Sequence, residues 1–126
     1  MTFKKAERKQ AKLKLAMTGP SGSGKTMSSL LMASGMGKKI ALVDTENGSA
    51  SLYSDRFSFD VLELDAPYTI AKYTEAIKAA QAAGYEVLVI DSITHAWAGD
   101  GGLLAKKEAL DARGGNSYTN WAGITK

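Results

Sequence analysis

The sequence predicts an α/β fold of three layers, in which helices cover both faces of a mostly parallel sheet. Two apolar runs, at residues 40–44 and 86–91, are short and nearly unbroken, as expected for strands covered on both faces. Segments with helical spacing separate such runs, and this alternation favours parallel pairing with right-handed crossovers. Asp44 and Asp91 end the two runs, at the strand ends where sheets of this kind bind their ligands.

The first half of the chain predicts two strands around one helix. Residues 13–18 alternate between apolar and polar side chains and end at Gly19, which indicates a strand. A helix is expected from Lys25, with Gly35 or Gly37 as its C-terminal cap. The buried-type strand 40–44 follows that helix.

The second half continues the alternation. Residues 59–64 predict a weaker strand, and apolar residues at helical spacing over residues 70–80 predict a helix that Gly84 ends. The strand 86–91 comes next, then a helix over residues 103–113 that a glycine pair interrupts. Residues 118–125 predict the start of another helix.

The composition indicates one soluble domain. The chain has 126 residues, 44% of them hydrophobic and 23% charged, and it has no cysteine, which excludes disulfides and thiolate metal sites. The longest strongly apolar run, residues 87–90, is far too short to cross a bilayer, and the N-terminus does not resemble a signal peptide. We therefore expect a protein of the cytoplasm without a membrane partner, built from a basic segment, residues 1–12, and a domain, residues 13–126.

The formal net charge of +3 is concentrated near the N-terminus. Basic side chains gather there around a single acid, Glu7; they are Lys4, Lys5, Arg8, Lys9, Lys12 and Lys14. This pattern is typical of a solvated tail, and the alternative is a contact to the phosphate backbone of a nucleic acid.

Residues 19–26, GPSGSGKT, fit the phosphate-binding P-loop pattern between a predicted strand and a predicted helix. Glycines let backbone N–H groups turn inward, and the helix N-terminus adds positive potential. Lys25 is expected to reach the outer phosphates, and the Thr26 hydroxyl to bind Mg²⁺. The residues expected at the nucleotide are Gly19, Pro20, Ser21, Gly22, Ser23, Gly24, Lys25, Thr26 and Met27.

Two carboxylates are candidates for the rest of the chemistry. Asp91 ends a buried strand as the Walker B aspartate does, and we expect it to bind Mg²⁺ with Thr26; its other reading is a local cap. Hydrolysis also needs a group that orients water. The residue after Asp91 is Ser92, so Glu46, two residues beyond Asp44, is the candidate, unless it is only a loop carboxylate in solvent.

In these motifs the chain resembles the RecA-like recombination ATPases. The similar segments are GPSGSGKT, ALVDTEN and VLVIDSIT, in that order, and short phage-encoded ATPases that act beside single-strand annealing proteins are similar also in the segment at residues 92–97. The resemblance implies ATP and Mg²⁺ as ligands and hydrolysis with Glu46 as the water-activating residue. It places Tyr53 over the adenine, whereas Ala50 stands where the family often has an acidic residue.

The resemblance also implies partners. It predicts single-stranded DNA binding in phage-type recombination or annealing, a homo-oligomer, an annealing or single-strand binding protein as partner, and a bacterial or phage-infected cell as location. The family has a DNA-binding loop in the region after Asp91, and the candidate contacts are Lys106, Lys107, Arg113 and Tyr118. The alternative for this region is an amphipathic surface helix.

The RecA-like core is larger than this chain. In that family the strand after the Walker B helix lies between the P-loop strand and the Walker B strand, and here it would come after Lys126. We therefore expect the N-terminal part of such a core, incomplete at its C-terminus. The alternative is a sheet in which the two nucleotide-binding strands pair directly.

Two other functions remain open at this stage. A small-molecule phosphotransferase would need arginines to clamp a second substrate, and the chain has Arg8, Arg56 and Arg113, none in an evident lid. A non-catalytic subunit could use the nucleotide only to hold an assembly together. A GTPase is disfavoured because no Asn-Lys-x-Asp stretch is present.

Overall fold

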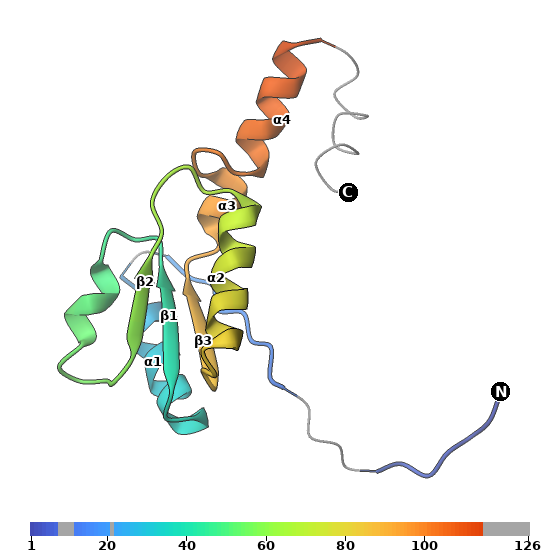
Figure 1. The fold of residues 1–126 in the computed structure, drawn as a ribbon, viewed down its shortest axis with the longest axis vertical. Coiled ribbons are helices and arrows are strands. Elements are labelled where there is room, and N and C mark those ends of the chain that lie inside the picture. The colour runs from blue at the N-terminus through green and yellow to red at the C-terminus, as the bar shows by residue number, and fades with distance from the viewer. Residues whose placement is uncertain (8–11, 21, 115–126) are drawn as a thin grey trace.

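The computed structural model describes residues 1–7, 12–20 and 22–114, and its centre is a sheet of three parallel strands (Figure 1). The strands β1 (Ile40–Asp44), β2 (Asp60–Glu63) and β3 (Val87–Asp91) lie in the order β2-β1-β3. Both neighbours pair with β1 in parallel, so the carboxyl ends of all three strands lie at one edge of the sheet.

Helices cover both faces of this sheet (Figure 1). On one face lie α1 (Lys25–Met36) and the short 3₁₀ helix η1 (Ser49–Tyr53), and on the other lies α2 (Ile70–Ala82). Beyond the carboxyl ends of the strands, α3 (Thr94–Ala98) packs against α4 (Leu103–Ala112), which projects away from the sheet. The predicted three-layer α/β fold is confirmed.

The core on the α1 side joins α1 to β1 and η1. Leu30 of α1, Leu42 of β1 and Ala50 of η1 form a buried cluster, with exposed fractions of 0%, 1% and 0%. Partly buried side chains close it from the rim: Tyr53, Phe57, Phe59 and Val89. Because successive side chains of a strand alternate between faces, Val43 is buried on the side of α2.

The prediction of a strand at residues 13–18 is wrong. Residues 12–20 form neither strand nor helix, and Leu13, Leu15 and Met17 are 61%, 56% and 40% exposed. A strand needs a neighbour to bond with, and no strand in the described residues lies beyond β3. The alternative prediction, in which a strand at residues 13–18 pairs directly with β3, is therefore also wrong for the part of the chain that the structure describes.

The other predicted elements are present, with ends that differ by a few residues. Gly37 caps α1, and Gly84, at a φ of 77°, follows α2. The sequence did not predict η1 or α3, which are five residues each and too short for a clear periodic pattern. The helix predicted at residues 118–125 lies outside the described residues. Among the described helices, none has the length and apolar character that crossing a membrane requires.

The core predicts a sharp contrast between two neighbouring leucines of α1. Leu30 is fully buried and Leu31 is 56% exposed. Leu30→Ala should lower the free energy of unfolding by about 2–5 kcal/mol, because it removes buried methyl groups and leaves a cavity. Leu31→Ala, the matched control, should change it by less than about 0.5 kcal/mol. Urea unfolding followed by circular dichroism measures both, and equal losses would contradict this core.

Candidate nucleotide-binding site

The glycine-rich loop runs directly into α1. Gly22 and Gly24 have φ angles of 78° and 89°, in the left-handed region that favours glycine. Gly24 is the N-cap residue of α1, and no side chain caps the first turn. The first N–H groups of the helix, including that of Met27, therefore have no intrahelical acceptor, as at an anion-binding helix N-terminus.

Lys25 folds over its own loop. Its Nζ donates to the carbonyl oxygens of Gly19 at 2.6 Å and Pro20 at 2.9 Å. These bonds hold the ammonium group at the mouth of the loop, beside the helix N-terminus. A phosphate bound there would offer Lys25 charged acceptors in place of neutral carbonyls, and charge-assisted hydrogen bonds are stronger.

Thr26 and Asp91 meet although 65 residues separate them in sequence. Thr26 Oγ1 donates to Asp91 Oδ2 at 2.6 Å, which brings the first turn of α1 to the end of β3. Both groups are half-buried. A hydroxyl and a carboxylate are oxygen donors of the type that Mg²⁺ prefers when phosphates and water complete its coordination. The two residues predicted for the metal are thus in contact and fit it chemically.

The candidate metal pair is not part of a larger cluster of metal ligands in the described residues. Among the described residues, no group of three or more His, Cys, Asp or Glu side chains is arranged to hold a metal ion. A site made by Thr26 and Asp91 alone therefore leaves most coordination positions to phosphate and water, which is usual for Mg²⁺ with a nucleotide.

The parallel register brings the ends of β1 and β3 together. Asp44 lies opposite Asp91, and the Thr45 N–H donates to the Asp91 carbonyl oxygen at 2.8 Å. Thr45 Oγ1 accepts from the Ser92 N–H at 2.9 Å and donates to the Ser92 carbonyl oxygen at 3.1 Å. Thr45, which is 1% exposed, therefore ties the two strand ends together, a role that the sequence alone did not suggest.

Asp44 is used by the backbone of the loop that carries Glu46. Its Oδ1 accepts from the Glu46 N–H at 2.7 Å, and its Oδ2 accepts from the Ala50 N–H at 3.2 Å. Asp44 is 1% exposed, so both bonds lie out of water. The carboxylate thus fixes the loop between β1 and η1, and it does not lie free for catalysis.

Glu46 lies on the exposed side of this loop, next to Ser92. Its Oε1 accepts from Ser92 Oγ at 3.0 Å and lies 4.0 Å from His95 Nδ1. Two neighbouring strand ends therefore bring Glu46 and Asp91 to the same part of the sheet edge. The side chain is partly exposed, so water can reach it.

A polar network behind Glu46 involves His95, the lone histidine of the chain. His95 Nδ1 lies 3.0 Å from Thr45 Oγ1, and the His95 ring stacks on Tyr68 with centroids 4.4 Å apart. The donor in the contact between His95 Nδ1 and Thr45 Oγ1 depends on the tautomer of the ring. His95 is therefore a structural part of the site.

Tyr73 of α2 contacts Ser92 from the face of the sheet opposite α1. Its hydroxyl donates to the Ser92 carbonyl oxygen at 3.0 Å. Burial is the main cause that raises the pKa of Tyr73 above its usual value. The hydroxyl therefore stays protonated at neutral pH and remains a donor to Ser92.

The predicted adenine contact lies at the end of η1. Tyr53 packs against the buried cluster of Leu30, Leu42 and Ala50, and its ring is partly exposed. Its stacking on adenine stays a prediction. Ala50 is fully buried, and its N–H is bound to Asp44, so an acidic side chain at this position would be buried. This packing accounts for alanine where the resembling family often has an acid.

The predicted DNA contacts differ in their surroundings. Lys106 and Arg113 are exposed on α4 and at its C-terminal end. The Lys107 side chain is only 7% exposed, and its Nζ lies 2.6 Å from Asp111 Oδ2. Lys107 is thus engaged within its own helix. Tyr118, like Ser21 of the P-loop, lies outside the described residues.

A glycine-rich loop with two left-handed glycines at a helix N-terminus, next to a threonine–aspartate pair, is typical of a P-loop nucleotide-binding domain. A family model described as an AAA domain matches residues 11–125. The chain belongs to this AAA family, whose domains are nucleotide-binding ATPase domains. Comparisons with curated proteins and with solved structures gave no match.

The role of Asp44 in holding the loop between β1 and η1 can be tested by substitution. In Asp44→Asn one carboxylate oxygen becomes an NH₂ group, which would face the N–H of Glu46 or of Ala50, donor against donor. Since the site is buried, we expect a loss of about 1–3 kcal/mol in the free energy of unfolding. The exposed Asp55→Asn is the matched control, with a change within about 0.5 kcal/mol. Urea unfolding measures both, and an unchanged Asp44→Asn variant would contradict the assigned role.

Proposed function

We propose that this AAA-family chain is the nucleotide-binding part of a RecA-like, Mg²⁺-dependent ATPase that couples ATP hydrolysis to single-stranded DNA binding in phage-type recombination or annealing. The observation that carries the proposal is the contact between Thr26 and Asp91 at 2.6 Å, with Glu46 on the neighbouring strand end. This contact supports the proposal that Thr26 and Asp91 form a metal pair and that Glu46, at the same edge of the sheet, is the base.

The loop and the metal pair have separate tasks in this proposal. The loop N–H groups and Lys25 hold the phosphates, with Lys25 exchanging its bonds to Gly19 and Pro20 for phosphate oxygens. Thr26 and Asp91 hold Mg²⁺, which neutralises charge on the phosphates. Tyr53 stacks on the adenine from the end of η1.

Glu46 is the proposed general base. Ser92 donates to one of its carboxylate oxygens, which fixes the side chain while the other oxygen remains able to accept from water. The Asp44 bonds hold the backbone beneath it. A water molecule between Glu46 and the outer phosphate would be oriented for attack and would pass its proton to the carboxylate.

Single-stranded DNA is proposed to contact the region after Asp91. Here α3 and α4 continue from the carboxyl edge of the sheet (Figure 1). His95, which contacts Thr45, belongs to α3. Exposed Lys106 and Arg113 are better placed to follow a phosphate backbone than Lys107, which is paired with Asp111. An annealing or single-strand binding protein in a bacterial or phage-infected cell remains the proposed partner.

The metal pair predicts how Mg²⁺ should affect nucleotide binding. Thr26→Val keeps the shape of the side chain but removes the hydroxyl, so the affinity for ATP should lose most of its dependence on Mg²⁺. Thr26→Ser, the matched control, keeps the hydroxyl and should retain that dependence. A titration of ATP affinity against Mg²⁺ concentration compares the three proteins, and a Thr26→Val protein that responds to Mg²⁺ like the original would contradict this metal site.

The decisive test of the ATPase is Glu46→Gln. The variant should bind ATP within a few-fold of the original protein, because its charge is not needed to hold the phosphates. Turnover should fall by roughly 10²-fold or more, the scale of losing a general base. Asp55→Asn, the control, should keep normal turnover.

The same measurement separates the proposed function from its alternatives. Phosphate release should rise with single-stranded DNA, and Lys25→Ala should abolish it. Phosphate release that needs a small-molecule acceptor would point to a phosphotransferase. ATP binding without any turnover would leave a non-catalytic nucleotide-binding subunit, and normal turnover in Glu46→Gln would move the base elsewhere.

A further inference from the structure

His95 lies beside one oxygen of the Glu46 carboxylate. Its Nδ1 is 4.0 Å from Glu46 Oε1, the same oxygen that accepts from Ser92 Oγ at 3.0 Å. Among the described residues no hydrogen bond reaches Oε2, and the Glu46 side chain is 44% exposed. One oxygen of the carboxylate therefore faces protein groups, and the other can accept from water.

The His95 ring is fixed at its face and at its edge. The face stacks on Tyr68, with centroids 4.4 Å apart and planes 18° apart. At the edge, Nδ1 lies 3.0 Å from Oγ1 of the buried Thr45. The ring cannot turn without losing one of these contacts, so Nδ1 stays directed at the Thr45 hydroxyl and the Glu46 carboxylate.

Tyr68 is held in turn by the connection between α3 and α4. The Tyr68 N–H donates to the Asp100 carbonyl oxygen in this connection. A Cβ at Gly99 would lie only 2.8 Å from Tyr68 Cδ2, so the contact leaves no room for a side chain at residue 99. The ring that supports His95 is thus closely packed on its own far side.

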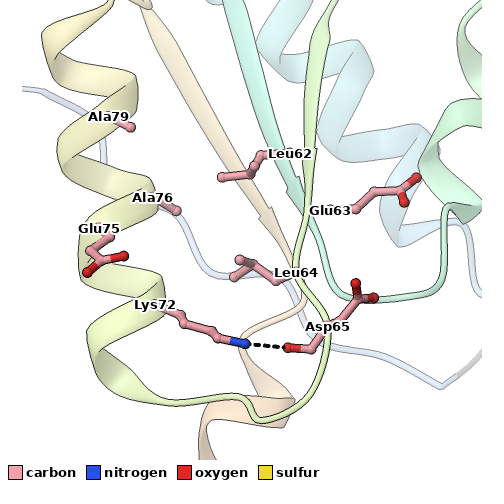
Figure 2. A pocket seen from close by; sticks show the side chains of 8 residues that line it. All are labelled: Leu62, Glu63, Leu64, Asp65, Lys72, Glu75, Ala76 and Ala79. Carbon is pink, nitrogen blue, oxygen red and sulfur yellow. Dashed lines mark hydrogen bonds between the residues drawn. The ribbon is translucent and has the colours of Figure 1, made fainter.

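The loop that carries Tyr68 starts beside an open groove between β2 and α2 (Figure 2). Leucines from the strand side and alanines of α2 line this groove, which has a volume of about 460 Å³. Across it, Lys72 of α2 donates its Nζ to the Asp65 carbonyl oxygen at 3.1 Å. The Leu64 N–H donates to the Asp44 carbonyl oxygen at 2.8 Å. These bonds tie the start of the loop to α2 and to the end of β1.

We propose that His95 is a positioning residue for Glu46, the proposed general base. In the ATP-bound site its Nδ1–H donates to Oε1 beside the Ser92 hydroxyl, and Oε2 faces the attacking water. The present 4.0 Å is longer than a hydrogen bond, and contacts of catalytic groups often tighten only when substrate binds. As the water oxygen bonds to the outer phosphorus and the bond to ADP breaks, the water proton passes to Oε2.

This inference rests on the proposed function, because it takes Glu46 as the base. It adds which residues orient that base: Ser92 and His95 directly, and Tyr68 through the ring stack. A base held in one orientation keeps more of the rate advantage that comes from alignment with the reacting water.

Two substitutions separate the donor of His95 from its ring. His95→Phe keeps a ring that can stack on Tyr68 but has no donor, whereas His95→Asn loses the ring but keeps an N–H donor at the same position of the side chain. His95→Phe should lower kcat roughly tenfold or more with KM for ATP within a few-fold, and His95→Asn should retain most of the turnover. A purely structural His95 predicts the reverse order. The reverse order, or equal turnover of the two variants, would overturn the proposal.

A double variant tests whether His95 acts through Glu46. Once the base is gone, the residue that orients it should matter no further, so His95→Phe with Glu46→Gln should turn over ATP as slowly as Glu46→Gln alone, within about twofold. A further loss of roughly tenfold would overturn the proposal. Normal turnover in Glu46→Gln would remove the proposed base itself, whereas a slow Glu46→Gln beside a normal His95→Phe would overturn this inference alone.

The lone histidine of the chain gives a readout that needs no turnover. In untagged protein the imidazole nitrogen NMR signals belong to His95 alone. At constant pH, Glu46→Ala and Tyr68→Leu should each shift these signals, and the exposed Asp55→Asn, the control, should leave them in place. Signals that respond to Glu46→Ala no more than to Asp55→Asn would show that His95 and Glu46 do not interact, and would overturn the proposal.

Discussion

The parallel pairing of β1 with β3 is the constraint on which the site depends. It sets Asp44 opposite Asp91, so the loops after both strands leave the sheet side by side. Thr45 then bonds to the backbone of Asp91 and Ser92, which prevents the two loops from separating. A shift of one residue in this register would turn the side chains of one strand to the opposite face and take the carboxylates apart.

The three polar residues of the DTE segment, Asp44, Thr45 and Glu46, differ in burial and therefore in their hydrogen-bond partners. Asp44 and Thr45 are each 1% exposed and satisfy backbone groups, whereas Glu46 is partly exposed and faces Ser92. A buried carboxylate is stable only when hydrogen bonds replace its lost water, and Asp44 has two such bonds. Support for the loop that carries Glu46 therefore comes from its own immediate neighbours in the chain.

The two faces of the sheet are packed to different degrees. On the α1 side, large apolar residues from α1, β1 and η1 fill the space, and this packing fixes the helix that begins at the phosphate loop. On the α2 side, alanines of α2 face the leucines of β2 and leave a groove. The face that carries α1 is therefore the more closely packed of the two.

The sequence by itself determined the order of most elements, the phosphate loop and the strand-end carboxylates, because glycine patterns, apolar runs and helical spacing are local signals. It missed η1, α3 and the roles of Thr45, His95 and Tyr73, and it wrongly predicted a strand at residues 13–18. Only the tertiary structure decided these, because a strand forms where a neighbour offers hydrogen bonds. In the same way, a polar side chain takes its role from partners 47 to 50 residues away, as Thr45 does from Ser92 and His95.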